Sequence, residues 1–142
     1  MKHGPYGVCA ARSVLVVAPT TLCSTWNKEF LKWLGRERIQ PYLIDNSNKP
    51  SGFLKNIHSV MIISYERLIK HISDLENFKF DLIVCDEAHR LKNSNVKVAQ
   101  ALQKLCCPKR VLLTGTPIQH DLQEFFVLSN IANPGIFGSY AE

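Results

Sequence analysis

Residues 81–92, DLIVCDEAHRLK, decide the fold of this chain, because an apolar run stops there abruptly at two adjacent carboxylates. The run at 82–85 is short and contains β-branched side chains, which is typical of a strand buried on both faces of a parallel sheet. Asp86 and Glu87 follow at its carboxyl end. In open α/β sheets, ligands bind in the crevice outside those ends. The two acids are therefore predicted to lie at a functional site.

Four more apolar runs are predicted to be strands, and helical patterns separate them. The strands are expected at 13–18, 41–45, 60–64 and 109–114, and the helices at 22–34, 53–57, 65–75, 93–105 and 121–133. Strands that alternate with helices indicate βαβ units, which form a parallel sheet with right-handed crossovers. The sequence therefore predicts an α/β fold without an internal repeat or a linker between domains.

The first predicted helix has capping signals and an apolar face. Thr20 and Thr21 are candidates for its N-cap, and Gly35 is predicted to end it. Trp26 and Trp33 lie on the apolar face, which predicts that both are core anchors and that neither has a stacking role.

Two later helices also carry capping signals. Ser64 is predicted to cap the helix at 65–75. The last helix is predicted to open with Asp121 and Glu124, an acidic variant of the capping box. It is predicted to bury three apolar side chains, Leu122, Phe125 and Phe126.

Composition restricts the class of protein. A chain of 142 residues with 46% hydrophobic content is sized for one domain with a sizeable core. A net charge of +5 would suit a polyanionic partner, although many soluble domains are mildly basic. The five cysteines form no C-x-x-C pair, which indicates reduced thiols in a cytosolic or nuclear protein. There is no N-terminal hydrophobic signal and no apolar run of membrane-spanning length, so no membrane partner is expected.

Polar motifs directly follow four of the predicted strands. They are APTT at 18–21, SYE at 64–66, DEAH at 86–89 and TGTP at 114–117. Because the carboxyl ends of parallel strands share one edge of a sheet, the four motifs are expected to converge on one crevice.

Asp86 and Glu87 suit metal-assisted cleavage of a phosphoanhydride. Mg²⁺ prefers oxygen ligands and keeps several waters, so one carboxylate can hold it while the other orients an attacking water. The alternative is that Asp86 caps the next helix and Glu87 is only solvated. His89 lacks a second ligand at i+3 or i+4, which disfavours a zinc site. The TGTP motif and His89 favour the metal-assisted reaction.

The two threonines of the TGTP motif have two possible roles. Thr114 and Thr116 could satisfy a strand-end turn, or their hydroxyls could take part in a hydrogen-bonded relay from the acids. Backbone amides after Pro19 and Ser64 suit phosphate oxygens where a helix N-terminus points at the crevice.

Taken together, the motifs resemble those of superfamily-two helicases. The matching strings are VVAPTTL at 16–22, IISYERL at 62–68, DEAHRLKN at 86–93 and LLTGTPIQHDLQEFF at 112–126. DEAHRLKN followed by LTGTPIQ is specific for the Swi/Snf-type ATPases that translocate on duplex DNA. WNKEFLKWLG, GPYG and NPGIFGS further resemble the recombination-repair branch, the RAD fifty-four-like translocases, and particularly their B form. The resemblance implies a RecA-like parallel sheet of the P-loop NTPase type, with helices on both faces.

The resemblance implies a site for MgATP at the strand ends. Asp86 would coordinate Mg²⁺ and Glu87 would polarise the attacking water, while His89 with Thr114 and Thr116 would couple nucleotide state to DNA contact. The residues implied at the nucleotide are Asp86, Glu87, Thr114, Gly115 and Gln119. His120 stands where the family usually has asparagine, which puts the coupling geometry in question.

The resemblance also implies double-stranded DNA as a partner. Thr20, Thr21, Ser64 and Tyr65 would contact the phosphate backbone, which predicts binding that is independent of sequence and sensitive to salt. A strand-exchange recombinase is the protein partner implied, and the nucleus is the implied location.

The G-x-x-x-x-G-K-[ST] motif of this family is absent from the sequence. The resemblance places that motif just upstream of residue 1, and it places a second lobe with a catalytic arginine beyond Glu142. Residues 1–12 are expected to be a loop or tail, and 13–142 a partial helicase ATP-binding domain, an incomplete first lobe. The missing P-loop strand would flank the strand at 109–114, leaving an apolar edge unpaired.

Three hypotheses compete. The first is a fragment of an ATP-dependent DNA translocase that acts in homologous-recombination repair and is inactive in isolation. The second is a truncated, catalytically inactive module that binds DNA or a recombinase. The third, an RNA helicase lobe, rests on the letters DEAH alone, and the following Arg90, Leu91, Lys92 and Asn93 disfavour it.

Overall fold

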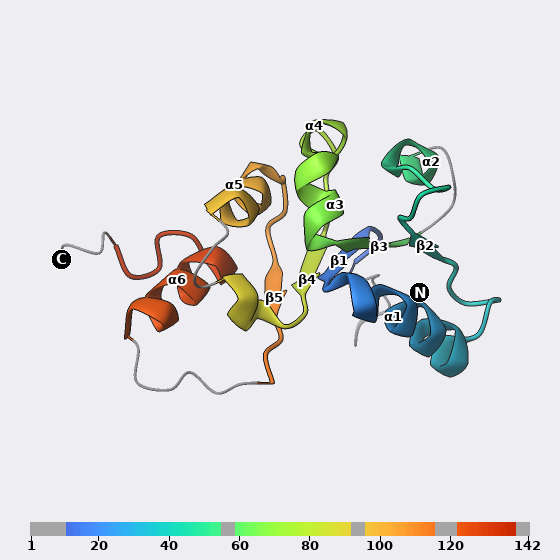
Figure 1. Cartoon of the computed structure of the whole chain (residues 1–142), viewed down its shortest axis with the longest axis horizontal. Helices are drawn as coiled ribbons and strands as arrows, with labels where there is room; N and C mark the ends of the chain where they lie inside the picture. The colour runs from blue at the N-terminus through green and yellow to red at the C-terminus, as the bar shows by residue number, and fades with distance from the viewer. Residues whose placement is uncertain (1–10, 55–58, 92–95, 116–121, 139–142) are drawn as a thin grey trace.

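A parallel sheet forms the centre of the computed structural model, which describes residues 11–54, 59–91, 96–115 and 122–138 (Figure 1). Five strands pair in the order β2-β3-β1-β4-β5, and every pairing is parallel. The strands are β1 Val14–Ala18, β2 Pro41–Leu43, β3 Val60–Ser64, β4 Leu82–Cys85 and β5 Arg110–Leu112. The five predicted strands are confirmed, and β2 and β5 are shorter than predicted.

Helices connect the strands. They are α1 Thr20–Leu34, α2 Pro50–Leu54, α3 Tyr65–Lys70, α4 Ile72–Leu75, the 3₁₀ turn η1 Ala88–Leu91, α5 Val96–Lys104 and α6 Leu122–Ala132. The single helix predicted at 65–75 is wrong, because the chain leaves the helical conformation at His71, with φ −111° and ψ 18°. The helix predicted at 53–57 instead begins at Pro50, a residue that suits a first helical turn because its missing N–H is not needed there.

The two faces of the sheet carry separate hydrophobic layers. Alternate residues of a strand point to opposite faces, so Leu15 and Val17 pack with α3, α5 and α6, whereas Val16 and Ala18 pack with α1. Figure 1 shows α1 on the side of the sheet opposite α3 and α5. Helices on both faces are therefore confirmed. No helix in the described ranges is long and apolar enough to cross a membrane.

The first helix differs from its prediction at one end and on part of its surface. Pro19 is the N-cap residue and no side chain caps α1, so Thr20 and Thr21 are the first helical residues and the predicted caps are wrong. Gly35 ends the helix as predicted, with φ 72° and its N–H donating to the Leu31 carbonyl. Trp33 is 72% exposed, so it is no core anchor.

The last helix buries a different face from the one predicted. Leu122 is 86% exposed and Phe125 is 44% exposed, whereas Leu128 and Ile131 are buried. The apolar residues of α6 surround most of the helix, so periodicity does not select a face, and packing against α5 and β5 selects it instead. The predicted cap at Asp121 lies outside the described residues.

Candidate active site

The strand register brings the polar motifs to one edge of the sheet. Ala18 pairs with Ser64 at the ends of β1 and β3, and Cys85 pairs with both Val17 and Leu112. The segments that follow β1, β3, β4 and β5 therefore leave the sheet on the same side. The predicted convergence is confirmed for the described residues, and Thr116 and Gln119 lie outside them.

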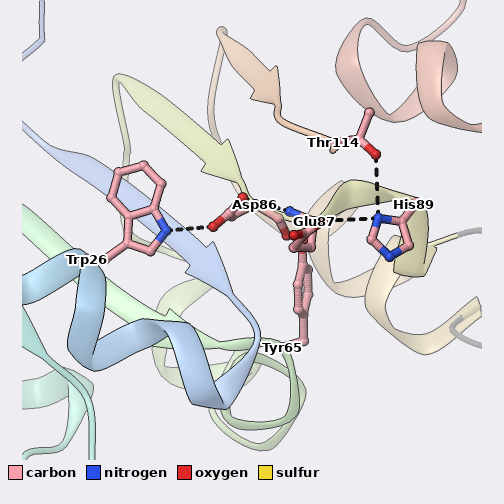
Figure 2. A network of polar contacts seen from close by, with 6 residues as sticks. All are labelled: Trp26, Tyr65, Asp86, Glu87, His89 and Thr114. Atoms are coloured by element: carbon pink, nitrogen blue, oxygen red, sulfur yellow. Dashed lines mark hydrogen bonds and ion pairs between the residues drawn. The ribbon is translucent and has the colours of Figure 1, made fainter. Parts of the chain in front are cut away.

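Asp86 is fixed by four hydrogen bonds with four parts of the chain, and Figure 2 draws three of the partners, Trp26, Tyr65 and Glu87. Its backbone N–H donates to the Val17 carbonyl of β1 at 2.8 Å, and its carbonyl accepts from the Tyr65 hydroxyl at 2.7 Å. Oδ1 accepts from the backbone N–H of Glu87 at 2.9 Å, and Oδ2 accepts from the indole N–H of Trp26 at 2.7 Å. Both the position and the carboxylate orientation of Asp86 are thus set.

The donor set at Asp86 fits Mg²⁺. Each carboxylate oxygen has two lone pairs and accepts one of the hydrogen bonds just described, which leaves lone pairs for a hard cation or for its waters. The described residues contain no group of three His, Cys, Asp or Glu side chains that could enclose a metal ion. An ion held by Asp86 would take its other ligands from water and phosphate, which is the usual manner of Mg²⁺.

Glu87 has a strained backbone. Its φ is 51°, in the left-handed region that non-glycine residues seldom adopt and that costs about 1–3 kcal/mol. The next residue explains why the strain persists, since the Ala88 N–H donates to the Leu113 carbonyl at 2.8 Å and holds η1 against the end of β5. Such strain is found most often at functional sites.

His89 contacts two of the predicted site residues. Its Nδ1 lies 3.1 Å from Oε2 of Glu87 and 3.4 Å from Oγ1 of Thr114 (Figure 2). The structure therefore brings Glu87, His89 and Thr114 together across the ends of β4 and β5. Gly115 follows in the exposed segment after β5.

The four predicted DNA contacts divide into two pairs. Thr20 and Thr21 are exposed at the start of α1, and the Thr20 hydroxyl donates to Oε2 of Glu66 at 2.9 Å. Ser64 is 2% exposed, and its hydroxyl accepts from the Arg67 N–H, so its predicted capping role is confirmed. Tyr65 is buried and directs its hydroxyl to Asp86. In this conformation the hydroxyls of Ser64 and Tyr65 therefore make hydrogen bonds within the fold.

Sequence reasoning missed two residues of this site. Trp26 was expected only in the core, yet a largely apolar ring with a single N–H donor usually needs a polar partner when it is buried, and that need was a usable signal. Glu66 was named only as part of the motif at 64–66, and its contact with Thr20 joins the starts of α1 and α3, which follow the paired strand ends Ala18 and Ser64.

The cysteine beneath the acids is not a nucleophile. Burial raises the pKa of the Cys85 thiol to about 12 and that of the Cys23 thiol to about 11, so both are protonated at neutral pH. Neither thiol is therefore available as a nucleophile at this edge.

Comparison with known proteins gives the family. The SNF2-related domain matches residues 3–142. The chain is 53% identical over 139 residues to "DNA repair and recombination protein RAD54B" of Homo sapiens and 44% identical over 146 residues to "DNA repair and recombination protein RDH54" of Saccharomyces cerevisiae. These matches cover 96% and 95% of this chain but only 15% and 16% of the length of those proteins.

A solved structure shares the fold. The Sulfolobus solfataricus SWI2/SNF2 ATPase core in complex with dsDNA matches with a TM-score of 0.80 and 26% sequence identity, over 92% of this chain and 27% of that one. The match covers nearly the whole of this chain, and it confirms the predicted RecA-like fold. This chain therefore belongs to the SNF2-related domain family.

Proposed function

We propose that this chain is part of the first lobe of an ATP-dependent double-stranded DNA translocase that acts in homologous-recombination repair in the nucleus. The observation that carries the proposal is the pair Asp86 and Glu87, which is fixed at the carboxyl end of β4. His89 contacts the Glu87 carboxylate there. The relatives are named as DNA repair and recombination proteins, which supports this biological setting. The dsDNA bound to the matching SWI2/SNF2 core supports double-stranded DNA as the proposed partner.

In this proposal each residue at the end of β4 has a distinct task. Asp86 holds the Mg²⁺ of MgATP, and the ion supplies charge stabilisation at the phosphoryl group. Glu87 orients and polarises the attacking water. His89 holds the Glu87 carboxylate and connects it to Thr114 at the end of β5. Gly115 and Gln119, which follow in the sequence, would contact the nucleotide.

DNA contact is proposed at the start of α1. Thr20 and Thr21 offer exposed hydroxyls there, and the first N–H groups of a helix have no partner within the helix. Ser64 and Tyr65 are buried and their hydroxyls make hydrogen bonds inside the fold, so in this conformation Thr20 and Thr21 carry the proposed contact. Contacts of this kind carry no sequence information and weaken with salt.

The free side of β5 supports a longer protein. Within the described residues β5 pairs only with β4, and Val111 and Leu113 are exposed large hydrophobic side chains. We propose that a further strand, followed by the phosphate-binding G-x-x-x-x-G-K-[ST] loop, pairs here in that protein. The loop lysine and an arginine from a second lobe would complete phosphate binding.

The proposal is tested by comparing this chain with the longer protein. We expect DNA-stimulated phosphate release from the longer protein and none above background from the chain alone, because the chain has no P-loop lysine to stabilise the transferring phosphoryl group. Hydrolysis by the chain alone that Glu87→Gln abolishes would contradict this limit. A longer protein without DNA-stimulated hydrolysis would contradict the proposal.

A second candidate function is non-catalytic binding of DNA or of a recombinase. The exposed hydroxyls of Thr20 and Thr21 favour it, because they do not depend on the acids. Fluorescence anisotropy with labelled duplex DNA distinguishes the two. Duplex binding that survives Asp86→Ala and falls steeply with salt supports the non-catalytic binding function. Absence of duplex binding at low salt counts against that function.

Glu66 is expected to oppose DNA binding. A hydroxyl has one hydrogen to donate, and Thr20 gives it to Glu66, so a phosphate must compete with that carboxylate. Glu66→Gln should raise the duplex affinity by about two- to fivefold at low salt, the scale of one exposed charge interaction. Glu76→Gln, an exposed acid after α4, is the matched control and should leave the affinity unchanged. Equal affinities for the Glu66→Gln and Glu76→Gln chains would remove this role from Glu66.

A further inference from the structure

We propose that Trp26 is a positioning residue for Asp86, and that its indole N–H sets the Mg²⁺ affinity of the site. This inference rests on the proposed function, in which Asp86 holds Mg²⁺. Trp26 lies on α1 and Asp86 follows β4, so the bond joins two elements 60 residues apart in the chain. Figure 2 shows the indole directed at the carboxylate from the side opposite His89.

The geometry of this hydrogen bond restricts the orientation of the Asp86 carboxylate. The distance from Nε1 of Trp26 to Oδ2 of Asp86 is 2.7 Å, which is short for an N–H···O bond and typical of a bond to an ionised acceptor. The other oxygen, Oδ1, accepts from the Glu87 N–H. With both oxygens held, the carboxylate cannot rotate without losing a bond, so its remaining lone pairs keep a fixed direction. An indole N–H only donates, so Trp26 cannot itself replace Asp86 as a ligand.

The indole is itself held in place. Its ring lies 5.6 Å from the Phe30 ring, at an angle of 39°, and both rings pack against the hydrophobic layer beneath α1. On its remaining side the ring borders a pocket of about 240 Å³, which is lined by Leu22, Thr25, Trp26, Glu29 and Asp86. The pocket belongs to the same site, because Asp86 is part of its wall. A donor held by packing and aimed at a metal ligand raises metal affinity by keeping that ligand in its binding orientation.

Trp33 provides a matched comparison on the same helix. Its indole N–H also donates to a carboxylate, Oε2 of Glu29, at 2.6 Å, but the ring is 72% exposed, and the pocket at Asp86 is lined by Glu29 and not by Trp33. Trp33→Phe therefore removes a bond of the same kind from an exposed ring and leaves the Glu29 side chain in the pocket wall.

The first experiment observes the bond directly in this chain. In a ¹H–¹⁵N spectrum the chain gives two indole resonances, and Trp33→Phe identifies that of Trp26. Asp86→Ala should shift the Trp26 resonance upfield and leave that of Trp33 unmoved, while Glu29→Gln should shift the Trp33 resonance. A Trp26 resonance that Asp86→Ala does not move overturns the proposal, and this reading requires neither ATP nor Mg²⁺.

The second experiment measures the metal requirement of the longer protein. Trp26→Phe keeps an aromatic ring but removes the donor, so the Mg²⁺ concentration for half-maximal hydrolysis should rise about tenfold. Turnover at saturating Mg²⁺ should change by less than about twofold, and Trp33→Phe should alter neither quantity. An unchanged Mg²⁺ requirement overturns the positioning role. If Glu87→Gln instead leaves hydrolysis intact, the proposed function fails while the resonance shift still reports the bond.

Discussion

Glu87→Gln is expected to lower the DNA-stimulated ATP hydrolysis of the longer protein by about 10²–10⁴-fold, the contribution of a positioned general base. The amide keeps the size of the side chain but cannot accept a proton from the attacking water. His89 Nδ1 lies 3.1 Å from the Glu87 carboxylate, so the substitution also replaces a contact to a carboxylate oxygen by a weaker contact to an amide. Phosphate release at saturating ATP and duplex DNA measures the loss.

Stability and binding separate this loss from unfolding. The side chain of Glu87 is 35% exposed, so its amide variant should keep the melting temperature and the duplex affinity close to those of the parent. Glu37→Gln, in the exposed turn after α1, removes the same charge away from the acids and should retain full hydrolysis. A Glu87→Gln protein that hydrolyses ATP at the parental rate would exclude Glu87 as the base.

The strained backbone of Glu87 bears on how the site changes state. Directly after the left-handed Glu87, the bond from the Ala88 N–H to the Leu113 carbonyl ties η1 to the end of β5. Displacement of the segment after β5 would therefore alter both the backbone at Glu87 and the contact between His89 and Thr114. The same residues that couple β4 to β5 thus set the direction of the proposed base.

The sheet could be predicted because its signals are local. Each buried parallel strand is an apolar run of a few residues, and the polar motif after each run marks the shared edge. Because Cys85 at the end of β4 pairs with Leu112 at the end of β5, the residues that follow the two strands lie close together. Nδ1 of His89 accordingly lies 3.4 Å from Oγ1 of Thr114. Contacts along the sheet edge are consequences of topology.

The remaining features depend on packing between elements, which the local pattern does not contain. The partner of the Trp26 indole is fixed by how α1 is rotated on the sheet, and the same rotation exposes Trp33. In α6 the apolar residues allow more than one face to be buried, so the sequence predicts Phe125 in the core, whereas its side chain is exposed. The break at His71 likewise separates α3 from α4 within one apolar pattern.

Phe80→Ala is expected to lower the free energy of unfolding of the chain by about 3–5 kcal/mol, the cost of emptying a buried aromatic site. Phe80 is 1% exposed, and its ring lies 4.7 Å from that of Phe78 and 6.4 Å from that of Phe53. Three packed rings leave little freedom to fill the cavity. Because a domain is stable by only about 5–15 kcal/mol, the loss should be visible as a large shift of the urea midpoint.

Phe125→Ala is the matched variant, since it removes the same atoms from a position that sequence periodicity assigns to the core. Its ring is 44% exposed and rests on Phe137 at 5.7 Å, also an exposed residue, so little surface leaves water on folding. The loss in unfolding free energy should stay below about 1 kcal/mol. Equal losses for Phe80→Ala and Phe125→Ala would mean that α6 buries the predicted face in solution. A large loss for Phe80→Ala alone places the core between the sheet and the Phe53, Phe78 and Phe80 rings, with the outer face of α6 left free.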